Sequence, residues 1–489
     1  MTSTVEMPLW ALLLILGLAA VAALDRVLAP SVRWFFRRRM ERAVARLNRR
    51  LTRPIEPFRL ARRHDMIQRL VYDPKVAEAI AATARDEGIP ENVAFERARA
   101  YAREIVPRFS TAAYFGFATR AASWLSRQLY RVRLGHFDRE RLEAIDPDAT
   151  VVFVMNHRSN MDYVLVTFLV ADRAALSYAV GEWARVWPLR QLIRAMGAYF
   201  IRRKSRNPLY RRVLARYVQM ATAGGTTQAI FPEGGLSLDG ALRPPRLGLL
   251  HYVVSGFDSD SMRDVVFVPV ALNYDRVLED RVLLAAAADG GRHFRFGKWR
   301  MVGFVAGQLW LKMRGRFRRY GYAAVSFAAP LSLRAFLGRQ AGNVSGNAPP
   351  DAGITEALAG ELMARIASAV PVLPVPLVAT VMLRAGTPLD AAQITARAVD
   401  LGECLRACGA HVHMPRDSLE YAADKGLRLL AQRRLIVQED MLCRPASDPD
   451  ARRVLEYYAR SIAHLVARCP GDAGRKAGRC GHKITKQKI

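Results

Sequence analysis

Short apolar runs alternate with amphipathic stretches between about residues 134 and 337. Five runs are rich in Val, Ile, Phe and Ala and have the length of strands: 150–155, 176–181, 198–201, 228–231 and 265–272. Three stretches between them have helical spacing: 161–170, 183–196 and 209–223. Strands that alternate with helices predict an α/β domain with a largely parallel sheet and helices on both faces, which we place at residues 134–337.

An uncharged stretch runs from Met7 to Leu24. As a helix it would be about 27 Å long, just enough to cross the hydrocarbon core of a bilayer. Several arginines follow it closely, whereas the residues before it contain Glu6 and no basic residue, which argues against a cleaved signal peptide. By the positive-inside rule we expect residues 1–30 to be a single membrane anchor, with the rest of the protein on the cytoplasmic side.

Residues 31–133 are predicted to be a helical region, with helices at 41–51, 74–86, 90–106 and 110–132. The last of these helices interleaves aromatic and apolar residues with arginines. Such a face can rest on a membrane surface, or it can pack against the next domain, and the sequence favours neither.

The chain after the α/β domain changes in composition. Residues 338–352 are rich in Gly, Asn and Pro and predict a linker, followed by a helical accessory domain at 353–470. Within that domain, 367–383 is strongly apolar but contains three prolines, so a buried segment or a shallow membrane contact is favoured over a spanning helix. The Gly-, Lys- and Arg-rich tail, 471–489, is expected to be disordered and to bind lipid.

Composition adds a strong charge to this picture. The chain has 489 residues, 51% of them hydrophobic and 24% charged, and its net charge is +30. This charge favours anionic partners, such as membrane lipids or phosphorylated substrates. No sequence motif that reads nucleic acid accompanies it, so no nucleic-acid partner is expected.

Five cysteines lie in the last fifth of the chain: Cys404, Cys408, Cys443, Cys469 and Cys480. They form no Cys-x-x-Cys pair, and His411 and His413 have no third ligand at a spacing typical of zinc sites. We therefore expect reduced, mostly structural cysteines, no metal and no cofactor.

Three of the predicted strands are followed by reactive or charged residues. The first is followed by His157, the third by Arg202, Arg203 and Lys204, and the fourth by the run Pro232-Glu233-Gly234-Gly235. In open parallel sheets the ligand crevice lies outside the carboxyl ends of the strands. These residues are therefore predicted to share one site.

His157 has a candidate partner in Asp162, which falls in the first turn of the helix predicted at 161–170. A carboxylate bonded to Nδ1 would fix the imidazole tautomer and leave Nε2 as a general base for a substrate hydroxyl. This is the orienting half of a Ser-His-Asp triad without its serine. The alternative is that His157 helps to cap the helix and Asp162 complements the helix dipole.

Four blocks of this chain resemble, in order, those of the glycerolipid acyltransferase superfamily. They are HRSNMDY at 157–163, GAYFIRR at 197–203, FPEGG at 231–235 and VPVALNYDRV at 268–277. The resemblance is strongest to the membrane-bound glycerol-3-phosphate and dihydroxyacetone-phosphate acyltransferases, and it covers roughly residues 134–465.

The resemblance implies an enzyme of membrane phospholipid synthesis. It would move a fatty acyl group from acyl-CoA or acyl-carrier protein to the sn-1 hydroxyl of glycerol 3-phosphate, giving lysophosphatidic acid. His157 would deprotonate the acceptor hydroxyl and Asp162 would orient His157. Residues implied in acceptor binding are Arg158, Arg202, Arg203, Lys204, Glu233, Gly234, Gly235 and Arg246, and Pro269 belongs to a block associated with the acyl donor.

Some residues depart from the pattern of these acyltransferases. Leu236 and Leu238 stand where close relatives have arginines, for which Arg243 or Arg246 can substitute. Asn156 and Pro232 are more typical of lysophosphatidic acid acyltransferases. The alternative acceptors are therefore lysophosphatidic acid and dihydroxyacetone phosphate. The alternative to an enzyme is a membrane-anchored pseudoenzyme or scaffold, against which the intact His157 and Asp162 argue.

Overall fold

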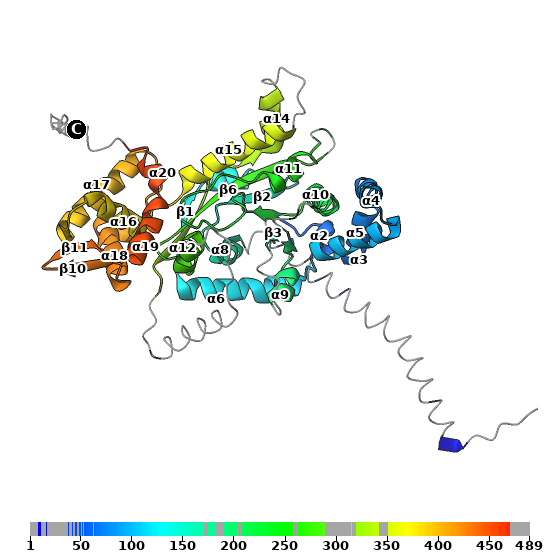
Figure 1. Cartoon of the computed structure of the whole chain (residues 1–489), viewed down its shortest axis with the longest axis horizontal. Coiled ribbons are helices and arrows are strands. Elements are labelled where there is room, and N and C mark those ends of the chain that lie inside the picture. Colours follow the sequence, from blue (N-terminus) through cyan, green and yellow to red (C-terminus); the bar gives the residue numbers. More distant parts are fainter. Residues whose placement is uncertain are drawn as a thin grey trace, which may run out of the picture. The chain divides into compact units, whose positions relative to one another are not determined.

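An eight-stranded sheet forms the centre of the protein in a computed structural model (Figure 1). The structure describes residues 8–10, 16, 38, 42, 45, 48–49, 51, 53–61, 63–170, 175–181, 189–202, 205, 207–258, 260, 262–288, 314, 319–341 and 351–469. The described residues from Glu56 onward belong to one compact unit, which contains the sheet, and those up to Ile55 belong to another.

The strands follow the order β1-β7-β6-β2-β5-β3-β4, and β8 also pairs with β6. Their bounds are β1 Arg131–Phe137, β2 Thr150–Met155, β3 Ser177–Val180, β4 Tyr199–Phe200, β5 Gln228–Ile230, β6 Val265–Tyr274, β7 Tyr322–Phe327 and β8 Leu331–Ser332. The strands from β6 to β4 in this order run parallel, whereas β7 and β8 are antiparallel to β6 and β1 is parallel to β7. The predicted α/β class with a mostly parallel sheet is confirmed.

Helices cover both faces of the sheet, which explains why β2 is buried at every position. On one side lie α14 (Leu333–Ala341) and α15 (Asp351–Ala369), and on the other lie α6 (Thr119–Leu129) and α8 (Met161–Val170) (Figure 1). All six residues of β2 are buried, between β5 and β6 in the sheet. A strand buried on both faces has no solvent side on which polar residues would be favoured.

The helices before the sheet largely follow the predicted pattern. They are α2 (Pro57–Leu60), α3 (Arg63–Val71), α4 (Pro74–Glu87), α5 (Glu91–Ile105) and a π-helix, η1 (Ala112–Ala118), that continues into α6. The predicted helix at 41–51 lies mostly outside the described residues. The helix predicted at 110–132 is too long, because α6 ends at Leu129 and β1 begins at Arg131. There Arg131 N donates to Gly321 O at 2.9 Å, so pairing with β7 replaces the helical hydrogen bonds.

The aromatic and basic face of this segment is divided between packing and solvent. Leu129 is buried, α6 packs against α8, and the Arg127 guanidinium lies 5.3 Å from the centroid of the Phe168 ring. Phe117 and Trp124 are more than half exposed. Of the two alternatives for this helix, packing against the α/β domain is therefore observed for one face.

The C-terminal region is helical with one small sheet. It contains α16 (Pro374–Ala385), α17 (Ala391–Ala407), the 3-10 helix η3 (Pro415–Asp417), α18 (Leu419–Gln432), α19 (Pro449–Arg460) and α20 (Ala463–Val466). The sheet, which the sequence pattern did not predict, joins β9 (Leu389–Asp390), β10 (Ile436–Glu439) and β11 (Leu442–Pro445). The ends of the predicted linker, 338–341 and 351–352, belong to α14 and α15, and its middle lies outside the described residues.

The proline-containing apolar segment is buried in this region, which was one of the two alternatives for it. Pro374 and Pro376 stand in the first turn of α16, where a missing backbone N–H leaves no helical hydrogen bond unmade. Residues 374–382 are all buried. None of the helices in the described part of the chain is both long enough and apolar enough to cross a membrane. Most of the predicted anchor, 1–30, and the whole basic tail, 471–489, lie outside that part.

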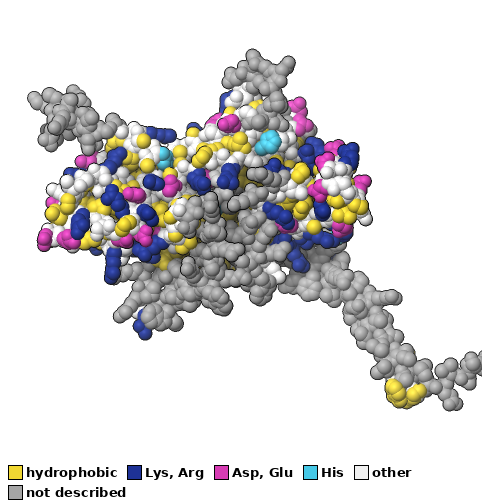
Figure 2. All heavy atoms as spheres, viewed as in Figure 1, with side chains coloured by type: hydrophobic (Ala, Val, Ile, Leu, Met, Phe, Trp, Pro, Cys, Tyr) yellow, Lys and Arg dark blue, Asp and Glu magenta, His cyan; other side chains and the backbone are white. Residues whose placement is uncertain are grey.

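The basic side chains do not gather in a single patch on the described part of the face seen in Figure 2. Figure 2 shows Lys and Arg side chains distributed over the visible face, among acidic and apolar ones. Several arginines form ion pairs, for example Arg216 with Asp73 at 2.6 Å and Arg433 with Asp280 at 2.5 Å. Part of the basic surplus therefore serves structural contacts within the fold.

Candidate active site at the carboxyl ends of the strands

Asn156 fixes the end of β2, from which the catalytic candidate follows. Its Nδ2 donates to Leu272 O at 3.0 Å and its Oδ1 accepts from Leu272 N at 2.7 Å. The side chain thus pairs with β6 much as another peptide unit would. Because Asn156 is fully buried, this pair of hydrogen bonds sets the position at which the chain leaves the sheet.

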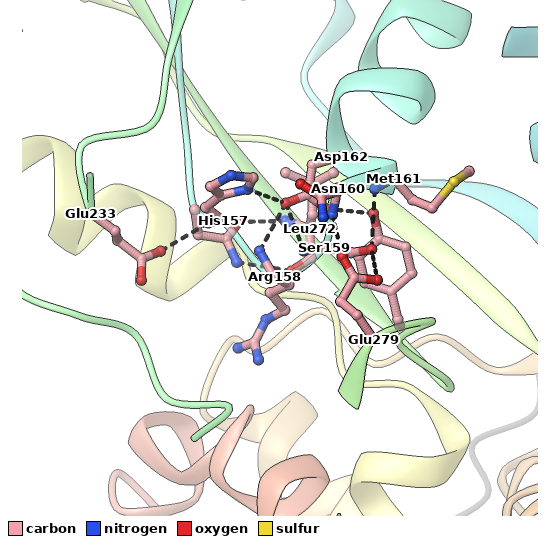
Figure 3. A network of polar contacts seen from close by, with 11 residues as sticks. His157, Arg158, Ser159, Asn160, Met161, Asp162, Glu233, Leu272 and Glu279 are labelled. Atoms are coloured by element: carbon pink, nitrogen blue, oxygen red, sulfur yellow. Dashed lines mark hydrogen bonds and ion pairs between the residues drawn. The ribbon is translucent and has the colours of Figure 1, made fainter. Parts of the chain in front are cut away.

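The structure brings His157 and Asp162 together (Figure 3). His157 Nδ1 lies 2.9 Å from Asp162 Oδ2, and the two residues are 1% and 0% exposed. The same Oδ2 accepts from the backbone N–H groups of Arg158 at 2.8 Å and Ser159 at 3.1 Å, while Oδ1 accepts from the hydroxyl of Tyr274. Asp162 therefore holds both the imidazole and the loop that carries it.

The alternative role for this pair, helix capping, falls to a different residue. Ser159 Oγ accepts from Met161 N at 3.1 Å, at the start of α8. The imidazole of His157 instead stacks on Phe231, with ring centroids 4.1 Å apart, and meets the Tyr163 ring edge-on at 5.5 Å. The candidate base thus lies between aromatic rings, in surroundings that strengthen its electrostatic contact with Asp162.

Glu233 clamps the backbone of the same loop. Its Oε1 accepts from His157 N at 2.9 Å and its Oε2 accepts from Arg243 N at 3.1 Å. Burial raises the pKa of Glu233 from its ordinary 4.5 to about 7, against the opposing effects of the His157 hydrogen bond and the charge of Arg158. Both oxygens of this predicted substrate ligand are thus bonded to backbone, an arrangement that positions His157.

Glu279, which sequence reasoning missed, makes the matching contact on the other side of the loop. Its Oε2 accepts from Ser159 Oγ at 3.0 Å and its Oε1 from Asn160 N at 2.6 Å (Figure 3). Burial raises its pKa from 4.5 to about 7. Residues 157–160 are therefore held by three buried carboxylates, those of Asp162, Glu233 and Glu279.

The raised pKa of Glu279 predicts a pH-dependent stability. A carboxyl whose pKa rises on folding contributes stability that is present below its unfolded pKa and is lost as the pH rises through its folded pKa. Between pH 5 and pH 8 the wild type should thus lose about 2 kcal/mol of unfolding free energy relative to Glu279→Gln. Denaturant unfolding of both proteins at the two pH values measures this difference. An equal change in both proteins would contradict the assignment.

Arg158, which was predicted to bind the acyl acceptor, points into the protein. It is 2% exposed, and its guanidinium donates through Nη1 to Gly240 O and through Nη2 to Ser461 O at 3.1 Å. Ser461 lies between α19 and α20, so the side chain links the catalytic loop to the C-terminal helices. The structure does not bring Arg158 together with the other predicted phosphate ligands.

A cavity of about 620 Å³ opens beside the His157 loop, at the carboxyl ends of β3, β4 and β5. Phe231 contacts His157 and also lines this cavity. The amino end of α10 (Pro208–Ala223) lines another wall. Four arginines contribute to the lining: Arg202, Arg211, Arg212 and Arg246. Of the predicted site residues, Arg202, Gly234 and Arg246 line this basic cavity.

The cavity arginines differ in how they are held. Arg202 forms a two-pronged ion pair with Glu104 of α5, at 3.0 and 2.6 Å, and Arg211 Nε donates to Ser205 O at 3.1 Å. Arg246 is exposed and packs over Gly234, whose φ is +67°. A Cβ at Gly234 would lie 2.5 Å from Arg246 Cδ, so glycine is required for this approach.

The remaining predicted residues lie apart from the cavity or outside the described chain. Gly235 is half-buried in the turn after Gly234. Pro269 is buried within β6, opposite Val154, and its carbonyl accepts from Ala328 N at 2.9 Å. Arg203 and Lys204 fall outside the described residues. Sequence reasoning missed Arg211 and Arg212, although their place in the first turn of a predicted helix was a usable signal for anion binding.

Comparisons with known proteins find similarity to acyltransferases. Residues 136–273 match the acyltransferase family, and residues 308–469 match the glycerol-3-phosphate acyltransferase C-terminal region. A glycerol-3-phosphate acyltransferase of Pseudomonas putida (strain W619) is 29% identical over 428 residues, which cover 83% of this chain and 49% of that protein. One of Xanthomonas campestris pv. campestris is 28% identical over 361 residues, 71% of this chain and 39% of that protein.

The chain spans about half the length of the curated relatives it matches. A solved structure, the 1-acyl-sn-glycerophosphate (LPA) acyltransferase of Thermotoga maritima, is 19% identical and covers 52% of this chain and 79% of its own. Its TM-score of 0.28 is too low to add to the assignment. These matches identify in this chain an acyltransferase domain followed by a glycerol-3-phosphate acyltransferase C-terminal region.

Proposed function

We propose that this protein transfers a fatty acyl group from acyl-CoA or acyl-carrier protein to the sn-1 hydroxyl of glycerol 3-phosphate, giving lysophosphatidic acid. The observation that carries the proposal is the buried pair of His157 and Asp162 beside a cavity lined by four arginines. The pair supplies a base for a hydroxyl, and the arginines supply donors for a phosphate. The relatives named as glycerol-3-phosphate acyltransferases support the same acceptor.

The chemistry follows from the contacts of the imidazole. With Nδ1–H donated to Asp162, Nε2 is the basic nitrogen, and it takes the proton of the acceptor hydroxyl. The hydroxyl oxygen attacks the thioester carbonyl, so a C–O bond forms and the C–S bond breaks. The proton then passes from the imidazolium to the leaving thiolate. Asp162 stabilises the transient imidazolium, and no acyl group becomes attached to the protein.

The phosphate of the acceptor is assigned to the basic cavity. Arg212 and Arg246 face it from α10 and from the turn beside Gly234, and the amino end of α10 adds its backbone dipole. Arginine suits this role because its planar fork can donate two parallel bonds to phosphate oxygens. Arg246 thereby offers a replacement for the charges that Leu236 and Leu238 do not supply.

Replacing Arg246 with alanine is expected to raise KM for glycerol 3-phosphate about 10- to 100-fold and to change kcat little. The estimate is the loss of one hydrogen bond between charged groups, about 1.5–3 kcal/mol. Steady-state kinetics with varied acceptor measures it. Arg428→Ala is the matched control, because Arg428 is an exposed arginine of α18 that pairs with Asp424. A change in kcat alone would place Arg246 outside the acceptor site.

The proposal places the reaction at the cytoplasmic face of a membrane. The uncharged stretch from Met7 to Leu24, the arginines after it and the net charge of +30 support attachment to anionic lipid. A lipid product that remains in the bilayer would make such attachment useful. Phospholipid synthesis is the process that this arrangement fits.

The deciding experiment supplies three acceptors separately: glycerol 3-phosphate, dihydroxyacetone phosphate and 1-acylglycerol 3-phosphate. Membranes containing the full-length protein receive a long-chain acyl-CoA, or acyl-carrier protein loaded with the same chain, and His157→Ala membranes give the background. Lysophosphatidic acid formed from glycerol 3-phosphate in a His157-dependent way supports the proposal. Selective acylation of another acceptor reassigns the substrate, and no transfer to any acceptor favours a scaffold.

A further inference from the structure

Three cysteines that are far apart in the sequence meet at the end of α17. Cys404 lies on this helix, Cys408 ends it, and Cys469 follows α20. Their Sγ atoms all lie within 4.8 Å of one another. None of the three forms a disulfide; Cys408 is exposed, and the other two are partly buried. The cluster is thus reachable by a small ion and partly shielded from solvent.

The local structure accounts for this grouping. Residues four apart share one face of a helix, and Cys408 N donates to Cys404 O at 3.0 Å, so the helical geometry extends to Cys408. The end of the C-terminal segment, residues 461–469, lies against this face, with Cys408 Sγ 3.8 Å from Arg468 O. Cys469 N donates to Val466 O at 3.2 Å, which directs the third thiol from the end of α20.

We propose that Cys404, Cys408 and Cys469 bind one Zn²⁺ ion through three thiolates. Thiolate sulfurs are the ligands that Zn²⁺ prefers in closed structural sites, and metal binding deprotonates the thiols. A tetrahedral zinc with Zn–S bonds of about 2.3 Å separates its sulfurs by roughly 3.8 Å. Small rotations of the three side chains close the remaining gap. The fourth position is filled by water or by another donor of the chain.

The ion would fasten the end of the C-terminal segment to α17. That segment includes Ser461, whose carbonyl accepts from Arg158, and His464, whose Nε2 lies 3.0 Å from Ala367 O. The proposal departs from the expectation of no metal. The sequence spacing concealed the site, because Cys469 stands 61 positions after Cys408 and joins it only through the fold.

Metal analysis of the full-length protein, purified with a reducing agent and without chelator, tests the proposal. About one zinc per chain is expected, and Cys404→Ser, Cys408→Ser and Cys469→Ser should each lower that content at least about tenfold. Cys443→Ala is the matched control, because Cys443 lies in β11 of the same region, apart from the cluster, and should keep the metal.

Cobalt substitution gives a readout that needs no variant. Co²⁺ bound by thiolates should produce intense near-ultraviolet absorption, and added Zn²⁺ should abolish it. Absence of this band together with absence of zinc overturns the proposal, even if the serine variants do not fold. A disulfide between two of the three cysteines in the reduced preparation, or zinc retained by the triple serine variant, overturns it as well.

Discussion

Replacing His157 with alanine is expected to lower kcat for acyl transfer roughly 10²- to 10⁴-fold, the range that a positioned general base contributes. The loss follows because, among the described residues at the end of β2, no second histidine contacts a buried carboxylate and could replace His157 as the base. Asp162 would keep its bonds from Arg158 N, Ser159 N and Tyr274, so the loop should stay in place. Acyl transfer from labelled acyl-CoA to glycerol 3-phosphate measures the effect.

Two further variants separate loss of the base from loss of the fold. His157→Gln fills more of the space against Phe231 and should be as inactive as the alanine variant, with a smaller change in Tm. His64→Ala removes a histidine whose side chain is 74% exposed on α3, and it should leave kcat unchanged. Activity of either His157 variant near the wild-type level would sink the assignment of the base.

Asp162→Asn is expected to lower kcat by a comparable factor, roughly 10²- to 10⁴-fold, with little change in KM for the acceptor. The amide oxygen can still accept from the loop, and its nitrogen can donate to the Tyr274 hydroxyl, so most of the geometry survives. The substitution does remove the negative charge that stabilises the imidazolium. Circular dichroism and kinetic constants measured on the same preparation distinguish these effects.

Tyr274→Phe is the comparison for Asp162→Asn. It removes the hydrogen bond to Asp162 Oδ1 and keeps the carboxylate charge. We expect a loss of tenfold or less in kcat, because one hydrogen bond to a charged group contributes about 1.5–3 kcal/mol and only part of it acts through His157. If the phenylalanine variant were as inactive as the asparagine variant, the Tyr274 bond and not the charge of Asp162 would be the essential feature.

The sequence was sufficient to predict most elements of the parallel part of the sheet, because these depend on local signals. An unbroken apolar run predicts a strand buried on both faces, and polar residues directly after such strands predict a crevice at that edge. The strand β1 was missed because its alternating pattern, with arginines at 131 and 133, continues an amphipathic helix without a breaking residue. Pairing with β7, almost 200 positions later, decided that segment.

The roles of individual polar residues were harder to predict, because they depend on distant partners. Arg158 stands beside His157 in the sequence, yet its side chain turns inward to carbonyls 82 and 303 positions away. Glu233 satisfies the backbone of a loop 76 positions before it. A local motif identifies which residues are important near the site, and only the fold decides whether each one faces substrate or supports its neighbours.

The bond between Arg158 and Ser461 also has a consequence for the order of biosynthesis. The 303 positions between them mean that the loop carrying His157 leaves the ribosome long before the carbonyl that accepts from Arg158 exists. At translation rates of about 5–20 residues per second, the delay is roughly 15–60 s. During that interval Arg158 lacks its hydrogen bond to Ser461. The nascent catalytic loop therefore reaches its final geometry only after the C-terminal helices have been made.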